Sequence, residues 1–250
     1  MLAHMLNDSG QQQNDYRLHC LGIVHSCFKQ KFGIPRQPGL VPEAEASIEI
    51  LPPYDRDEAF RGLEEVSHIW VVFVFHQAMR EAWRPTVRPP RLGGNQRIGV
   101  FATRSNFRPN PIGLSLVRLE AIERRDGRLW LDIRGADLLE GTPVLDIKPY
   151  LPYADSVEGA QAGFADTPPP TLPVQFSEPA QQQLHQFDTN GDGRLEALIR
   201  AMLSYDPRPA YQAEAQDGRE YGCRVHDYNV VWSVQNGVVR VQRIEKIHPS

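Results

Sequence analysis

Four short stretches of the sequence combine rigid Pro and Gly residues with side chains that could bind a small polar ligand. They are residues 35–39 (Pro-Arg-Gln-Pro-Gly), 84–95 (Arg-Pro-Thr-Val-Arg-Pro-Pro-Arg-Leu-Gly-Gly-Asn), 103–113 (Thr-Arg-Ser-Asn-Phe-Arg-Pro-Asn-Pro-Ile-Gly) and 146–152 (Asp-Ile-Lys-Pro-Tyr-Leu-Pro). Pro and Gly restrict a loop to few conformations, so its polar groups are held in place at low entropic cost. We therefore predict a preorganised ligand site in these loops.

Arginine is concentrated in the middle of these stretches. Residues 80–108 contain seven arginines and one acid, Glu81, so this segment carries +6 within a chain of net charge −4, and the remainder carries −10. A guanidinium grips phosphates with two hydrogen bonds and stacks on bases, so such a segment is typical of a surface that binds RNA or another anion. A G+C-rich genome would explain the ratio of 23 Arg to 4 Lys, but it does not explain the near absence of acids.

Two stretches resemble metal sites without meeting their requirements. Residues 188–193 (Asp-Thr-Asn-Gly-Asp-Gly) open like an EF-hand calcium loop, but the twelfth position, which needs a bidentate Glu, is Ile199. A polar turn between two helices, capped by Asp192, is the better interpretation. Four potential ligands also occur early in the chain: His19, Cys20, His25 and Cys27. One extended strand spreads them too far apart for a single tetrahedral ion, so we predict no metal.

Short apolar stretches separated by turn residues fill the chain up to residue 155. The clearest strand is 67–75, which is apolar on both faces, as in a barrel wall covered by another layer or subunit. Further strands are predicted over 16–26, 47–51, 97–103, 115–122, 128–133 and 143–147, with a hairpin at Arg125-Asp126-Gly127. Little helix is expected here, which favours an all-β barrel or sandwich.

The remaining chain predicts a small second domain. Residues 156–173 are rich in Ala, Gly, Asp and Pro and are expected to form a linker. Helices are predicted over 178–187 and 195–203, and strands over 221–234 and 238–244 that pair across Asn236-Gly237. We therefore divide the chain into a flexible tail (1–15), a β domain (16–155), the linker and an α+β domain (174–250).

Composition indicates where such a protein works. The 250 residues suffice for a real hydrophobic core, and the longest apolar run, residues 69–75, is too short to span a membrane. The start of the chain lacks a signal peptide, and the three cysteines form no CxxC pair, which favours a cytoplasmic location. No Gly-x-Ser-x-Gly, Walker, His-Glu-x-x-His or Gly-x-Gly-x-x-Gly motif occurs, so the usual hydrolase, nucleotide and Rossmann sites have no support.

From about Tyr16 to Arg243 the sequence resembles the TsaA-like (TrmO-type) tRNA methyltransferases. The resemblance rests on residues 103–113, on 146–150 (Asp-Ile-Lys-Pro-Tyr) and on 206–211, which read Asp-Pro-Arg-Pro-Ala-Tyr. It implies a single-sheeted β-barrel, a small C-terminal domain and a homodimer. The implied reaction is transfer of a methyl group from S-adenosylmethionine to N6 of threonylcarbamoyladenosine at position 37, in the tRNA anticodon stem-loop.

The resemblance also assigns roles to individual residues. The implied cofactor contacts are Pro35, Arg36, Gln37, His76, Gln77, Arg104, Leu114, Arg134, Gly135, Ala136 and Asp137. Without it, His76 would be read as a hydrogen-bonded histidine at a strand end. The expected tRNA contacts are Arg88, Arg91, Phe107, Arg108, Lys148, Arg208 and Tyr211.

The acceptor nitrogen is carbamoylated and weakly nucleophilic, so a base that removes its proton would assist methyl transfer. Asp146 and Tyr150 are the candidate bases, and the sequence does not choose between them. Two other classes remain open, namely a non-catalytic RNA-binding β-barrel and a regulatory protein whose C-terminal domain contacts a partner.

Overall fold

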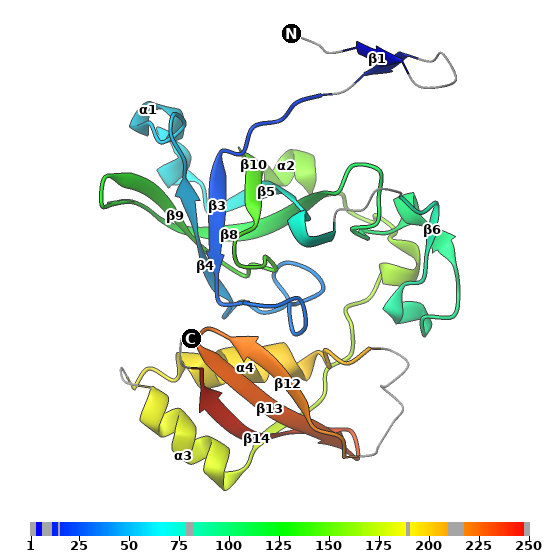
Figure 1. The fold of residues 1–250 in the computed structure, drawn as a ribbon, viewed down its shortest axis with the longest axis vertical. Helices are drawn as coiled ribbons and strands as arrows, with labels where there is room; N and C mark the ends of the chain where they lie inside the picture. Colours follow the sequence, from blue (N-terminus) through cyan, green and yellow to red (C-terminus); the bar gives the residue numbers. More distant parts are fainter. Residues whose placement is uncertain are drawn as a thin grey trace.

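The computed structural model describes residues 4–6, 12–14, 16–78, 83–188, 191–209 and 218–247. Figure 1 shows a β-barrel above a second sheet, with the segment around β6 projecting to one side. Six antiparallel strands close the barrel in the order β10-β3-β4-β9-β8-β5. They are β3 (Gly22–Ser26), β4 (Glu45–Ile50), β5 (His68–Val74), β8 (Ile112–Arg125), β9 (Arg128–Arg134) and β10 (Pro143–Pro149). The predicted mainly β fold with a barrel is confirmed.

Strict alternation of burial along the strands builds the barrel core. In β5, Ile69, Val71 and Phe73 point inward and are at most 5% exposed, whereas the residues between them are half-buried. These inward side chains pack with alternate residues of β4 and β9, such as Ile48 and Leu131. The half-buried outer face matches the expectation of a strand that is apolar on both sides.

Residues between β5 and β8 form an excursion that leaves the barrel at the end of β5. It contains two short paired strands, β6 (Thr86–Val87) and β7 (Ile98–Gly99), and three single-turn helices, η2 (His76–Ala78), η3 (Pro90–Leu92) and η4 (Val100–Ala102). Sequence analysis predicted a strand over 97–103 and was wrong for most of it. Gly99 and a turn at Val100 to Thr103 end the extended conformation after two residues.

The C-terminal part is a four-stranded sheet, in the order β11-β14-β13-β12, with two helices. Its elements are β11 (Val174–Phe176), α3 (Glu178–Phe187), α4 (Arg194–Ser204), β12 (Tyr221–Val225), β13 (Tyr228–Gln235) and β14 (Val238–Lys246). The single strand predicted over 221–234 is two strands, because His226 takes a positive φ of 49° and turns the chain. The hairpin at Asn236-Gly237 is present, and Ser177 caps α3 by accepting from the Ala180 N–H.

The remaining elements lie at the edges of the barrel and of the C-terminal part. They are the hairpin β1 (His4–Leu6) with β2 (Gln12–Asn14), α1 (Asp57–Phe60), η1 (Leu63–Glu65), α2 (Pro152–Asp155) and η5 (Gly163–Ala165). In the described part of the chain, no helix has the length and apolar character needed to cross a membrane.

The two bodies do not have independent cores. Cys27, Phe28, Val41 and Ala44, which belong to the connection between β3 and β4, are buried in the core of the C-terminal part. The main chain joins there too, because Phe28 forms an isolated β-bridge with Val225 and the His226 N–H donates to the Cys27 carbonyl. The connection from β3 to β4 therefore lies between the barrel and the C-terminal sheet.

Candidate cofactor site at the barrel rim

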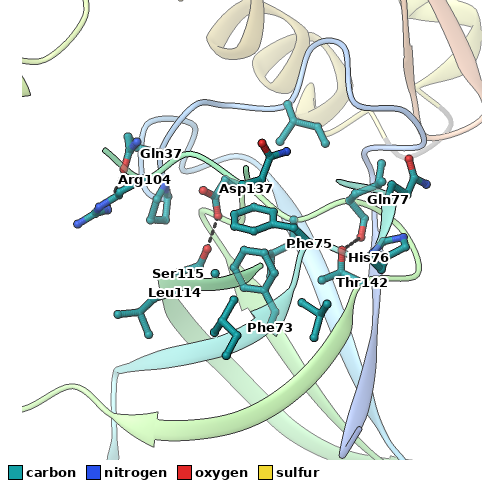
Figure 2. A pocket seen from close by; sticks show the side chains of 18 of the residues that line it. Gln37, Phe73, Phe75, His76, Gln77, Arg104, Leu114, Ser115, Asp137 and Thr142 are labelled. Carbon is teal, nitrogen blue, oxygen red and sulfur yellow. Dashed lines mark hydrogen bonds between the residues drawn. The ribbon is translucent and has the colours of Figure 1, made fainter. Parts of the chain in front are cut away.

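A cavity of about 600 Å³ opens at the barrel end where β5 stops and β8 starts (Figure 2). Its walls come from the end of β5, the start of β8, and three loops: residues 31–38, 103–110 and 137–142. This volume lies within the range of pockets that hold a cofactor or drug-sized ligand.

Two phenylalanines form the apolar floor of the cavity. The rings of Phe73 and Phe75 lie 4.9 Å apart, edge to face. The Phe73 ring occupies the space where a side chain at position 113 would begin, because a Cβ on Gly113 would lie 2.2 Å from it. This close approach explains why the Pro-Ile-Gly ending of the 103–113 stretch requires glycine.

A buried carboxylate faces the cavity above this floor. Figure 2 shows Asp137 and Ser115 pointing toward each other beside the Phe75 ring, and the Ser115 hydroxyl donates to Asp137 Oδ1 at 2.5 Å. Burial raises the pKa of Asp137 to about 6, against the opposing effects of the Ser115 hydrogen bond and the positive charge of Arg104. A carboxylate in such a position favours a cationic ligand, because a positive charge compensates for its lost hydration.

Hydrogen bonds between loops hold the rim in place. Arg104 Nη1 donates to Gln37 Oε1 at 2.8 Å, and Lys31 Nζ donates to the Gln77 carbonyl at 2.7 Å. Arg36 Nη2 donates to the Arg208 carbonyl at 3.2 Å, which connects the rim to the C-terminal part. Three hydrogen bonds to other segments thus hold the loop of residues 31–38 in place without the help of a ligand.

The turn at residues 134–137 supports the cavity mainly through its main chain. Gly135 has φ +72°, its N–H donates to the Ala44 carbonyl, and its carbonyl accepts from the Gly39 N–H at 2.9 Å. Arg134 forms ion pairs with Glu45 and Glu120, and Ala136 is buried in the barrel core. These three residues do not line the cavity, whereas Asp137 does.

Eight of the eleven residues assigned to the cofactor by resemblance line this one cavity, although they come from five separate stretches. They are Pro35, Arg36, Gln37, His76, Gln77, Arg104, Leu114 and Asp137.

The two candidate bases lie outside the cavity of a single chain. Asp146 Oδ2 pairs with Lys148 Nζ at 2.7 Å, and the ring of Tyr150 lies among those of His68 and Trp70. Asp146 lies within β10, which pairs with β5 on the side of the barrel, and Tyr150 directly follows this strand. A single chain therefore does not bring them to the residues around Asp137.

The expected tRNA contacts divide into three groups. Arg88, Arg91 and Lys148 are exposed, with Arg91 donating to the Thr167 carbonyl. Arg108 lines the cavity and donates to the Thr103 and Ser105 carbonyls, and Phe107 is half-buried in the same loop. Tyr211 lies outside the described residues.

Arg208 differs from the other expected contacts because its side chain is 3% exposed. It forms two 2.8 Å hydrogen bonds with the carboxylate of Asp206, which raise the pKa of the guanidinium. The Arg208 carbonyl accepts from Arg36 Nη2, so this residue contacts the cavity rim through its main chain, and its contact with tRNA stays a prediction.

Several lining residues were missed by sequence reasoning: Lys31, Phe73, Phe75, Ser115 and Thr142. Ser115 carried a usable signal, because it is a polar residue at an inward position of β8, between Gly113 and Val117. The others needed the folded chain, since nothing local distinguishes a pocket-lining Phe from a core Phe.

Several described residues of the two possible metal stretches have other partners. His25 contacts Glu49 at 3.2 Å and Glu140 at 3.4 Å, while Cys27 is buried in the other core. Over the residues with described positions, no group of three or more His, Cys, Asp and Glu could hold an ion. In the turn before α4, the Asp188 carboxylate accepts from the Gly193 N–H and Asp192 Oδ1 from the Arg194 N–H.

A closed antiparallel barrel with a cofactor-sized cavity at its rim, flanked by an arginine-rich excursion, defines a class of β-barrel ligand-binding proteins distinct from Rossmann enzymes. Two family models match the chain: the tRNA-methyltransferase O N-terminal domain over residues 23–156 and the TrmO C-terminal domain over 169–247. The chain belongs to the TrmO family.

Individual relatives agree with this assignment. A putative S-adenosylmethionine-dependent methyltransferase, RcsF, of Pseudomonas aeruginosa is 54% identical over 212 residues, covering 85% of this chain and 90% of that protein. The tRNA (adenine(37)-N6)-methyltransferase of Escherichia coli is 45% identical and covers 93% of this chain and 99% of its own length. The crystal structure of TrmO from P. aeruginosa superposes with a TM-score of 0.75 at 45% identity, covering 93% of this chain and 97% of that one.

Proposed function

We propose that this chain is an S-adenosylmethionine-dependent methyltransferase that methylates N6 of adenine 37 in tRNA, with threonylcarbamoyladenosine as the acceptor. The observation that carries the proposal is the convergence of the family's cofactor residues on one cavity of suitable size. The Escherichia coli relative named for this activity covers 93% of this chain, and both TrmO family models match it.

The residues around the cavity fit the cofactor's chemistry. S-adenosylmethionine carries a sulfonium that supplies the methyl group, an amino acid part with a carboxylate, and an adenine. Asp137 offers negative charge to the cationic part, and Arg36 and Arg104 offer guanidinium groups to the carboxylate. Phe73 and Phe75 provide an apolar surface for an aromatic ring.

In the proposed reaction, the bond from sulfur to the methyl carbon breaks as the bond to N6 forms, and the N6 proton passes to a base. The protein must hold acceptor and donor in line, which is the main source of rate enhancement in such a transfer. The hydrogen bonds from Arg104 to Gln37 and from Lys31 to the Gln77 carbonyl would serve this purpose, because they hold the loops around the cavity in which the donor would bind.

Arg104 gives a direct test of this site. Replacing it with Ala removes the bond to Gln37 and a positive charge near Asp137, so cofactor affinity and methylation should fall together. Calorimetry with S-adenosylmethionine and a methyl-transfer assay on tRNA measure the two effects. Arg97→Ala is the matched control, because Arg97 contacts Thr86 away from the cavity and should retain cofactor affinity. Unchanged turnover in Arg104→Ala would contradict the assignment.

The substrate is tested in cells by mass spectrometry of tRNA nucleosides. A strain lacking this protein should lose one methyl group from threonylcarbamoyladenosine and regain it on complementation. An RNA-binding protein without catalysis would bind tRNA but neither bind S-adenosylmethionine nor change the nucleoside. A regulatory protein would bind neither. We also propose a cytoplasmic location, where tRNA is modified, which cell fractionation checks.

We further propose a homodimer formed through the outer face of β5 and β8. Trp70, Val72 and Val74 lie opposite Leu116, Leu114 and Ile112 on this face, and Leu114 is 50% exposed. Leu114 and Ile112 also line the cavity, so a second copy seated here would cover its open side. Light scattering should show a dimer, and Leu116→Glu, which places a charge on this face away from the cavity, should yield a monomer.

Asp146 and Tyr150 remain the proposed bases, and the dimer is what could bring them to a neighbouring cavity. Asp146 pairs with Val72 of β5, next to this same outer face. If one of them is the base, Asp146→Asn or Tyr150→Phe should lower the rate of methyl transfer and alter its pH profile without changing cofactor affinity. A wild-type pH profile and rate in both variants would exclude them.

The proposed division into a domain of residues 16–155, a linker of 156–173 and a domain of 174–250 has its own test. Limited proteolysis should cut first inside 156–173, and a first cut elsewhere in the two domains would contradict this division.

A further inference from the structure

Two exposed aromatic side chains lie together on the excursion between β5 and β8. Trp83 is 49% exposed and Phe101 is 71% exposed, and their ring centroids are 6.3 Å apart at an interplanar angle of 31°. Large aromatic groups are costly to leave in water, so an exposed pair of this kind usually marks a binding surface.

The main chain beneath these rings holds them in place. β6 and β7 pair between Trp83 and Phe101, and the Val100 N–H donates to the Pro85 carbonyl at 2.9 Å. Val100 itself is 1% exposed, and its carbonyl accepts from the Thr103 hydroxyl at 2.8 Å. The pair therefore sits on an ordered ribbon, which lowers the entropic cost of binding.

The charge around the pair is strongly positive. Residues 83–108 contain six arginines and no Asp, Glu or Lys. Among the six, Arg84, Arg88, Arg91 and Arg97 are exposed. Aromatic side chains set among arginines are the combination with which proteins bind single-stranded nucleic acid, because phosphates contact the cations while bases stack on the rings.

The pair also lies close to the cavity along the chain. Phe101 precedes Thr103 and Arg104 by two and three residues, and both of these line the cavity. A nucleotide stacked on the pair would therefore belong to the same short stretch of RNA as a base presented to the cavity.

We propose that Trp83 and Phe101 form a stacking platform for an unpaired anticodon-loop base that neighbours the methylated adenosine. This inference rests on the proposed function and adds the surface that selects a single-stranded loop. A helical stem cannot use such a platform, because its bases are already stacked on one another.

The test measures tRNA affinity and salt dependence for Trp83→Ala, Phe101→Ala and the double variant. Loss of stacking should lower affinity by about 5-fold to 150-fold per base. The slope of log K against log salt should stay unchanged, because no phosphate contact is removed. Arg88→Ala should instead reduce that slope by about 0.7, the value for one single-strand phosphate.

Rescue and base removal sharpen the result. Phe101→Tyr and Trp83→Phe keep a ring and should retain most of the affinity, whereas Tyr16→Ala, an exposed aromatic outside the segment, should have no effect. An anticodon stem-loop lacking one base next to position 37 should lose affinity for the wild type, with no further loss in the double variant. Binding of the stem-loop should also quench Trp83 fluorescence.

The outcomes separate this inference from the proposed function. If the wild type binds S-adenosylmethionine and methylates tRNA while the double variant has unchanged tRNA affinity, the platform is wrong and the enzyme assignment stands. If the double variant becomes monomeric, the pair is a subunit contact and the platform is likewise overturned. A wild type that neither binds the cofactor nor methylates tRNA would overturn the proposed function itself.

Discussion

The barrel core and the C-terminal core are closed in different ways. The barrel fills its interior with alternate residues of its own strands, such as Ile48, Ile69 and Leu131. The C-terminal core is completed by Cys27 and Phe28, which lie about two hundred residues earlier in the chain than their partner Val225. The barrel core is thus built from the barrel's own residues, whereas the C-terminal core depends on the connection between β3 and β4.

This difference shows how the C-terminal part contributes to the cavity at the barrel rim. The borrowed segment continues into the loop of residues 31–38, where Phe32 stacks against Trp232 and Gly33 packs against Cys223. Ile34 contacts the C-terminal core and also lines the cavity. The C-terminal part therefore supports one wall of the cavity.

The largest expected effect comes from removing the shared side chain. Phe28→Ala should lower the free energy of unfolding by about 3–5 kcal/mol, because it leaves a cavity in a close-packed core. Since Phe28 connects the barrel to the C-terminal part, the two should unfold in a single transition in the wild type. Urea unfolding followed by the fluorescence of Trp130 in the barrel and Trp232 in the C-terminal core measures this.

The control for this prediction is Leu184→Ala, which removes a C-terminal core residue on α3 that does not line the cavity. It should destabilise the protein by about 2–5 kcal/mol yet leave the cofactor affinity of the folded protein unchanged. Two separate transitions in the wild type would show that the shared segment does not couple the two cores.

The charge of Asp137 should lower the stability of the folded protein and strengthen cofactor binding. At pH 3 the carboxyl is protonated in both folded and unfolded chains. As the pH rises from 3.8 to about 6, the unfolded chain loses this proton first, so the contribution to stability is lost. Asp137→Asn should therefore raise the free energy of unfolding at pH 8 by up to about 3 kcal/mol, and leave it unchanged at pH 3.

The same substitution should weaken cofactor binding. The wild type should prefer cationic S-adenosylmethionine over neutral S-adenosylhomocysteine, and the affinity for the cation should fall as the pH drops through about 6. Calorimetry from pH 5 to 8 on both proteins measures this. Equal preference for the two ligands in wild type and variant would show that the carboxylate does not face the positive charge.

The smallest expected effect concerns the hydrogen bond that holds Lys31, in the loop of residues 31–38, to the Gln77 carbonyl. Lys31→Met removes the bond to the Gln77 carbonyl, and since one such bond contributes about 0.5–1.5 kcal/mol, cofactor affinity should fall about 2- to 10-fold. Its melting temperature should fall by only about a few degrees. Lys29→Met, which breaks an ion pair with Glu140 outside the cavity, should keep full affinity, and equal effects of both variants would contradict the tie.

Local signals predicted those parts of the fold that neighbouring residues control. The helix over 178–187 is predicted with its observed bounds from its helical spacing, and the structure adds that Ser177 caps it. Both hairpins are right, since Asp126-Gly127 and Asn236-Gly237 adopt the positive φ angles that tight turns need. The turn at His226 was missed because no Gly or Pro stands beside it, and the strand β11 was missed because its three residues are held by pairing with the distant β14.

Sequence by itself determined the mainly β class of the first domain and the arginine-rich segment, while the resemblance added the barrel and the predicted cofactor residues. Their loops carry rigid, distinctive motifs that can be read without a fold. Only the tertiary structure decided that Phe28 completes a distant core, that Ser115 holds Asp137, and that Arg208 lies buried against Asp206. These contacts join residues far apart in the chain, and their energy depends on close packing that no local pattern records.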